Sequence, residues 1–300
     1  MAKYLNLKPV EFSALSAKRQ AAVQWKGRLM LPKYDGCFCM VGFFDGKPNF
    51  ILSRDGVPSL SMFHIYDDLI LRYPRIADTK GGYCFLGEAW SPGREFKDIS
   101  GSFRRHSPQV DLGYAVFDLV QYDNKEGKPL LYSNKPYSKR LELLSIRGRA
   151  YCHAYPPLPV ECEDEAHAWR YANYLKKLGG YDGAVVSDPD ATYVVSDGHG
   201  EFLKIKPLQS FSLAVVSVTG ALGDKTGRVT CSLEVRFKGL NCGVGTGFSN
   251  EQAAQWVADP SLIIGKTIEV ACMGVYDGPA GMMREPRFMG IRDDVIQPDY

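Results

Sequence analysis

Leu31-Pro32-Lys33-Tyr34-Asp35-Gly36 is the stretch around which the rest of the sequence can be organised. One lysine stands at the end of the run from Arg28 to Pro32, whose apolar residues predict a strand, and Asp-Gly is typical of a turn. An amine held at a strand end becomes a nucleophile when burial or nearby positive charge lowers its pKa. Taken alone, the stretch is explained at least as well by a surface lysine beside a turn, because short motifs often match by chance.

The composition is that of an ordinary globular protein with one large domain or two smaller ones. The 300 residues are 45% hydrophobic, 23% charged and 12% aromatic, which is enough to build a substantial core. The net charge of +2 does not indicate a polyanionic partner. A nucleic-acid surface would therefore be a local patch.

The cysteines and the termini indicate the compartment. The eight cysteines are scattered without a C-x-x-C pair, which favours free thiols in a reducing cytoplasm over a structural zinc site. No basic-then-apolar leader and no bilayer-length apolar run is present. We therefore expect a cytoplasmic protein, in the host cytoplasm if it is viral, with no membrane contact.

Hydrophobic periodicity predicts a mixture of helices and strands. A helix is expected from about Pro9 to Trp25. Strands with turns between them are expected over Arg28–Lys33, Cys37–Phe44, Asn49–Ser53, Tyr83–Trp90, Gly113–Val120 and Gly183–Ser187. Further helices are expected over Ser59–Leu71, Pro136–Ile146 and Glu163–Leu178. The polar residues 91–110 are expected to form a long connection, and such loops often carry function.

A domain boundary is expected between Pro207 and Ser210, where a lysine-rich strand ends in proline. Beyond it, short β segments are interrupted by one helix, Ser249–Val257, with Ser249 or Asn250 as its N-cap. About ninety residues of this kind fit a small Greek-key barrel of the OB type. The predicted class is α+β, with domains at 1–209 and 210–300.

Six short motifs occur in order, each at a strand end or a turn. They are Lys33-X-Asp35-Gly36, Ser53-Arg54-X-Gly56, Gly87-Glu88, Phe117-Asp118, Asp182-Gly183 and Lys204-X-Lys206-Pro207. Together they resemble the motifs of the covalent nucleotidyltransferase superfamily, which contains ATP-dependent DNA ligases, RNA ligases and mRNA capping enzymes. The resemblance covers residues 28–207 and implies a nucleotidyltransferase (adenylation) domain of antiparallel sheets flanked by helices, followed by an OB-fold β-barrel.

The resemblance implies a role for each motif. Lys33 would be the nucleophile that takes AMP from ATP, with Lys204 and Lys206 contacting the phosphates and lowering its pKa. The other expected nucleotide contacts are Pro32, Arg54, Glu88 and Phe117. Glu88 and Asp182 would hold Mg²⁺ near the phosphates. From the residues alone, Asp182 could instead be a turn residue before glycine, and Phe117 could be a core residue.

Three positions depart from the pattern of the superfamily. Phe38 stands where relatives usually have an arginine that contacts the nucleotide, and Ser187 stands where a lysine usually closes the strand of the Asp182-Gly183 motif. Leu31 replaces the acid that many relatives use to contact the adenine amino group. These departures leave the affinity for the nucleotide and the choice between ATP and GTP open.

Later segments resemble short phage-type DNA ligases. The segments are Phe96–Arg105, Gly243–Ser249 and Arg284–Phe288. They imply a monomeric enzyme of DNA replication or repair that seals nicked duplex DNA. Expected DNA contacts are Arg54, Lys97, Ser100, Arg104, Arg105, Arg284, Arg287 and Arg292, which would bind backbone phosphates without sequence preference. The alternatives are an RNA ligase, a capping guanylyltransferase and a nucleic-acid-binding relative without catalysis.

Overall fold

The computed structural model describes residues 6–77, 79–125, 128–145, 153–195, 200–222, 229–275, 281–295 and 297–300. The chain divides into two compact units, Met1–Pro207 and Leu208–Tyr300. Unit 1 contains all six motifs named above, and unit 2 is built mainly of strands. Each unit is described by itself.

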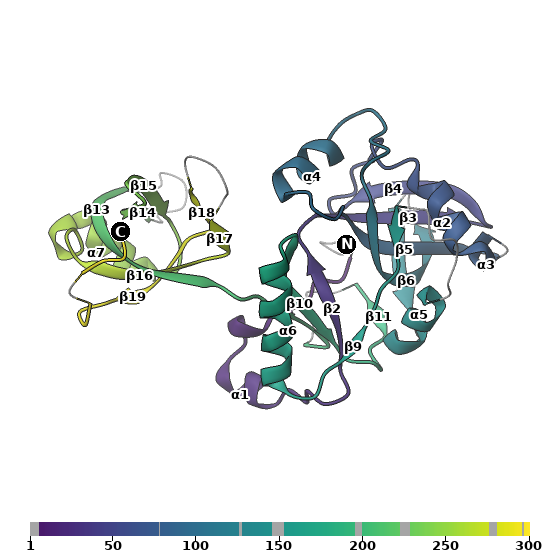
Figure 1. Ribbon diagram of the computed structural model, residues 1–300, viewed down its shortest axis with the longest axis horizontal. Helices are drawn as coiled ribbons and strands as arrows, with labels where there is room; N and C mark the ends of the chain where they lie inside the picture. The colour runs from purple at the N-terminus through teal and green to yellow at the C-terminus, as the bar shows by residue number, and fades with distance from the viewer. Residues whose placement is uncertain are drawn as a thin grey trace. The chain divides into compact units, whose positions relative to one another are not determined.

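The first sheet of unit 1 carries the lysines. Its strand order is β1-β12-β10-β2-β9, formed by Val10–Glu11, Phe202–Ile205, Tyr181–Ser187, Leu29–Tyr34 and Val160–Glu161. Helix α6 (Glu165–Leu178) packs against β10 (Figure 1) and begins at Asp164, whose side chain accepts from the His167 N–H. Met30 of β2 and Ala184 and Val186 of β10 are buried in one apolar cluster with residues of α6.

The second sheet of unit 1 has the order β11-β7-β6-β5-β3-β4, with β8 (Ala154–Tyr155) beside β6. Its strands are Tyr193–Val194, Lys128–Ser133, Tyr114–Lys125, Gly82–Ala89, Cys37–Phe44 and Lys47–Ser53. Both faces of the central strands bury apolar side chains. Helices α2 (Ile65–Arg72), α3 (Pro74–Ala77), α4 (Phe96–Phe103) and α5 (Tyr137–Leu144) complete unit 1 (Figure 1).

Two glycines allow the motifs to approach one another closely. A Cβ at Gly36 would collide with the carbonyl of Ala89 and the side chain of Glu88. Gly183 has a φ of +135°, and a Cβ there would collide with the Ile205 carbonyl. Because glycine alone has neither a Cβ nor this conformational restriction, these positions set the first motif against the third and the fifth against the sixth.

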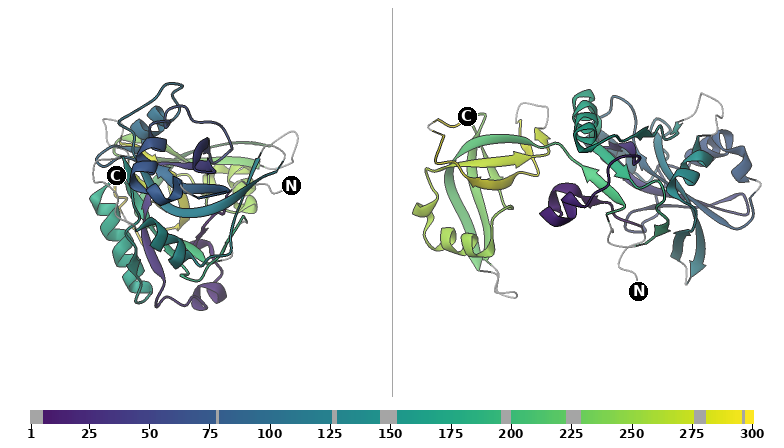
Figure 2. Two further views of the ribbon diagram at one scale, coloured as in Figure 1. Left: turned by 90° about the vertical axis from the view of Figure 1, so that its right-hand side faces the viewer. Right: turned by 90° about the horizontal axis from the view of Figure 1, so that it is seen from below.

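Unit 2 is a five-stranded antiparallel sheet in the order β15-β14-β13-β16-β19. The strands are Leu240–Val244, Val229–Phe237, Gln209–Leu222, Thr267–Cys272 and Arg287–Ile291, and they bend around one apolar core (Figure 2). A second pair joins β17 (Gly274–Val275) to β18 (Met283–Arg284). Helix α7 (Asn250–Ala258) begins at a capping box formed by Ser249 and Gln252, as predicted for Ser249.

The α+β class predicted from the sequence is confirmed. In unit 2 the strand pairing among the described residues does not close into a ring, although the Phe288 N–H donates to the Thr246 carbonyl at 2.8 Å. No helix in the described part of the chain is long and apolar enough to cross a membrane.

Two element predictions are wrong. The expected helix from Pro9 to Trp25 is three short pieces, β1, the 3-10 turn Phe12–Ala14 and α1 (Ala17–Ala21). Phe12 packs edge-on against Trp25 at 5.0 Å, and this contact folds the segment back on itself. The expected connection over residues 91–110 contains helix α4, whose Ile99 is fully buried.

Candidate functional site

Lys33 lies near the end of β2, directly opposite Gly183 of β10. Its Nζ donates to Oδ2 of Asp182 at 2.9 Å, and 22% of the lysine side chain is exposed. Asp182 is buried, so it is a paired strand residue rather than an exposed turn residue. The pair holds the amine at a defined point while leaving it accessible.

Strand register brings the lysines of the sixth motif to the same face of the sheet as Lys33. Val185 of β10 lies opposite both Leu31 of β2 and Lys204 of β12, and directly opposed residues share one face of a sheet. Lys204 is half-buried; burial, with Lys206 and Lys33 nearby, lowers the pKa of its amine. Three amines therefore converge, as expected for a site that binds phosphates.

Glu88 lines the same cavity as these lysines but belongs to the second sheet of unit 1. It lies at the end of β5, opposite Phe38 of β3. Burial raises the pKa of its carboxyl to about 7, although Lys33 and Arg54 act in the opposite direction. A carboxyl that titrates near neutral pH beside cations is typical of a functional site.

Aromatic side chains form the neighbouring wall. Phe117 is the extra residue of a bulge in β6, because Gly87 pairs with Val116 and Leu86 pairs with Asp118. Bulges redirect side chains. Phe117 lies 6.2 Å from Phe38, ring centre to ring centre, and the guanidinium of Arg54 lies 5.4 Å from the Phe38 ring. Phe38, one of the three departures from the superfamily pattern, is therefore part of this aromatic wall.

These groups line one cavity of about 290 Å³ between the two sheets of unit 1. It contains the predicted residues Pro32, Lys33, Arg54, Glu88, Phe117, Lys204 and Lys206. Leu31 also lines it, whereas Ser187 is buried outside its lining. The lining therefore combines cations with apolar and aromatic groups.

Sequence reasoning missed the pair that supports Phe117. Arg140 of α5 is fully buried and donates to both carboxylate oxygens of Asp118, at 2.7 and 3.0 Å. It also donates to the carbonyls of Lys135 and Ala191. These hydrogen bonds of a buried arginine hold α5 against β6. Asp118 stood in the fourth motif, but nothing in the sequence identified its partner.

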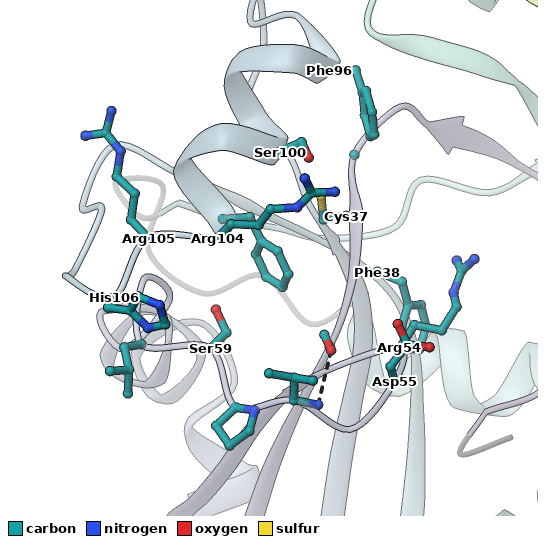
Figure 3. Close-up of a pocket in the computed structure, with 16 residues that line it drawn as sticks. Cys37, Phe38, Arg54, Asp55, Ser59, Phe96, Ser100, Arg104, Arg105 and His106 are labelled. Carbon is teal, nitrogen blue, oxygen red and sulfur yellow. Dashed lines mark hydrogen bonds between the residues drawn. The ribbon is translucent and has the colours of Figure 1, made fainter. Parts of the chain in front are cut away.

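A second cavity of about 470 Å³ contains several expected DNA contacts (Figure 3). Figure 3 shows Arg104 extending toward Cys37 and Ser100, whereas Arg105 points away from them. Arg54 lines both cavities. Ser100 is buried inside α4, and Lys97 is exposed outside the lining of either cavity. Arg54, Ser100, Arg104 and Arg105 therefore share the lining of the second cavity, and Lys97 lies outside it.

The three arginines expected to bind DNA in unit 2 have different surroundings. Arg287 lines a shallow cavity with Thr246, Gly247 and Glu285. Arg292 is held by Asp294, at 2.8 Å for each of two contacts, and lies 3.7 Å from Glu269. Arg284 pairs with Gly274 in the β17–β18 ladder.

The carboxylates fit a limited role in binding Mg²⁺. No group of three His, Cys, Asp or Glu side chains in the described ranges could hold a metal ion by itself. Glu88 and Asp182 provide two carboxylates beside the amine cluster, and Mg²⁺ is commonly bound by one or two carboxylates together with substrate phosphates. The residues therefore fit a metal that arrives with the nucleotide.

Comparison with known proteins identifies the fold. No protein-family model and no curated protein matches the chain. The solved structure named "Pmar-Lig_Pre." matches 97% of this chain and 68% of its own, with 22% identity and a TM-score of 0.70. A structure from a study of DNA binding by Lig E DNA ligases matches 96% of this chain and 99% of its own, with 16% identity and a TM-score of 0.69. This chain has the fold of DNA ligases.

A further match is a ligase structure that was solved in complex with ATP. The ATP-dependent DNA ligase from bacteriophage T7, in complex with ATP, matches 97% of this chain and 99% of its own. The identity is 16% and the TM-score 0.52. Because these matches span both units, the arrangement of a sheet-rich first unit followed by a second unit of strands is shared with ligases.

Proposed function

We propose that this protein is an ATP-dependent DNA ligase that seals nicks in duplex DNA. The observation that carries the proposal is the convergence of Lys33, Lys204, Lys206 and Glu88 on one cavity in a chain with the ligase fold. Unit 1 would be the adenylation domain and unit 2 the OB-fold domain. The described cysteines are free thiols, which suits the reducing cytoplasm.

In the first step, the Lys33 amine attacks the α-phosphorus of ATP. The bond from Nζ to phosphorus forms, the bond to the bridging oxygen breaks, and pyrophosphate leaves with the electron pair. The ammonium paired with Asp182 has no lone pair, so a proton must leave Nζ first. Lys204 and Lys206 would stabilise the charge on the phosphate oxygens, and Mg²⁺ bound with the phosphates would supply further charge.

In the later steps, AMP passes from Lys33 to the 5′-phosphate at a nick, and the 3′-hydroxyl then displaces AMP. Arg54 and Arg104, which line the second cavity beside the first, are the strongest candidates to bind the 5′-phosphate and its neighbours. Ser100 and Arg105 line the same cavity. Lys97, Arg284, Arg287 and Arg292 are further proposed DNA contacts. Such contacts give affinity that falls as salt rises.

The test is to incubate the protein with α-labelled ATP and Mg²⁺ and to measure a covalent protein–AMP adduct. Lys33→Ala abolishes the adduct, whereas Lys139→Ala, at an exposed site on α5, retains it. If no nucleotide gives an adduct, the proposal that the protein is an enzyme of this kind is refuted. If GTP alone gives an adduct, the protein is a capping enzyme. Nicked DNA and nicked RNA duplexes then distinguish a DNA ligase from an RNA ligase.

A further inference from the structure

An unpaired acceptor lies in the wall of the nucleotide cavity. Asn6 is 3% exposed and lines the cavity together with Leu7, Lys8 and Pro9. Its Nδ2 donates to the Leu7 carbonyl at 3.3 Å, while its Oδ1 has no hydrogen-bond partner among the described residues. A buried acceptor without a hydrogen-bond partner is energetically unfavourable. A ligand that donates a hydrogen bond to this oxygen would therefore gain binding free energy.

The position of Asn6 is held by its neighbours. The Leu7 N–H donates to the hydroxyl of Tyr193 at 3.0 Å. Three residues further on, Val10 and Glu11 pair in parallel with Leu203 and Lys204 of β12. The segment is therefore attached to the strand that carries a phosphate-binding lysine.

Asn6 adjoins the aromatic part of the cavity. Leu7 packs against the apolar cluster that contains Phe38, Leu86 and Tyr193, with Phe117 beside it. A nucleoside triphosphate with its phosphates on the lysines would place its base in this apolar part, where aromatic faces stack on a base. The unpaired oxygen would then face an edge of the base.

The orientation of the amide determines which base it accepts. If the amide were rotated by half a turn, Oδ1 would oppose the Leu7 carbonyl, so the donation from Nδ2 leaves Oδ1 as the available atom. The 6-amino group of adenine donates a hydrogen bond, whereas the 6-oxo group of guanine only accepts one. Leu31, in the same cavity, has no polar atom in its side chain with which to make this distinction.

We propose that Oδ1 of Asn6 accepts a hydrogen bond from the 6-amino group of adenine and thereby selects ATP over GTP. This inference rests on the proposed adenylation of Lys33. It assigns the choice of nucleotide to a residue outside the six motifs, on the segment that precedes β1.

The experiment compares ATP with purine riboside triphosphate, which lacks the 6-amino group and has no 6-oxo group. The wild type forms the adduct with ATP about 10- to 100-fold more efficiently, in kcat/KM, than with purine riboside triphosphate. Asn6→Ala loses that preference because its rate with ATP falls, while its rate with purine riboside triphosphate stays within about threefold of the wild type. Asn173→Ala, on the exposed side of α6, retains the preference.

Three results would overturn the proposal. The first is a wild type that uses the two triphosphates equally, which decides the matter without any variant. The second is an Asn6→Ala protein that keeps the wild-type preference. The third is a variant that fails with both triphosphates, because the proposal confines the loss to ATP. A wild type that forms no adduct with any nucleotide refutes the proposed function instead.

Discussion

Replacing Glu88 by glutamine should stabilise unit 1 at alkaline pH while lowering its activity. Burial raises the pKa of the Glu88 carboxyl from 4.5 to about 7. Between these values the folded state keeps a proton that the unfolded state has released. The free energy of unfolding therefore falls as the pH rises from 4.5 to 7, and the loss persists above pH 7.

The size of the effect follows from the shift. A pKa difference of this size corresponds to about 3 kcal/mol, and partial exposure of the side chain reduces it to about 2 kcal/mol. Glutamine resembles the protonated carboxyl in shape and does not titrate. We expect Glu88→Gln and the wild type to have equal stability at pH 4, and the variant to be about 2 kcal/mol more stable at pH 8.

The assay is urea unfolding at pH 4 and pH 8, without nucleotide or metal and with detection by tryptophan fluorescence. Glu161→Gln, at an exposed position on β9, is the control and should match the wild type at both values. If the variant and the wild type differ by the same amount at both pH values, the reasoning is wrong. Adduct formation by Glu88→Gln should nevertheless fall. A buried charge that a site keeps for its function lowers stability, so removing the charge raises stability and lowers activity.

Three further predictions concern packing, backbone and charge. Arg140→Met should lower the free energy of unfolding by about 3–5 kcal/mol in urea denaturation, because it leaves Asp118 buried and unpaired; a loss below about 1 kcal/mol contradicts this. Gly183→Ala should destabilise by about 1–3 kcal/mol in the same measurement, since its Cβ would collide with the Ile205 carbonyl, and wild-type stability would disprove the close approach. Arg104→Ala should weaken binding to nicked duplex DNA and reduce the slope of log affinity against log salt by about 1; an unchanged slope would exclude a phosphate contact.

Local signals predicted the strands around the first motif. Cys37–Phe44 has the bounds expected from its apolar run, because the Asp45-Gly46 turn marks its end. Gly46 has a φ of +73°, a conformation that glycine adopts without strain. Where a strand is bounded by turn residues and buries its side chains, a single sequence is sufficient.

Contacts between distant residues could not be predicted in this way. The segment from Pro9 to Trp25 has apolar residues at helix-like spacing, but the pairing of β1 with β12 and the contact between Phe12 and Trp25 outweigh local propensity. Asn6 has no neighbouring motif that marks it. Its significance depends on burial, on an unpaired oxygen and on a cavity wall formed by residues far along the chain.

The pairing of β1 with β12 has a consequence for folding during synthesis. Val10, among the first described residues, pairs with Leu203, close to the end of unit 1. The sheet that holds Lys33 therefore cannot be completed until almost the whole of unit 1 has left the ribosome. Until then the edge of β10 that pairs with β12 would stay unpaired, and unpaired edges are prone to aggregation. Expression at a lower temperature, where hydrophobic association between exposed segments is weaker, should raise the soluble fraction if this incomplete sheet limits the yield.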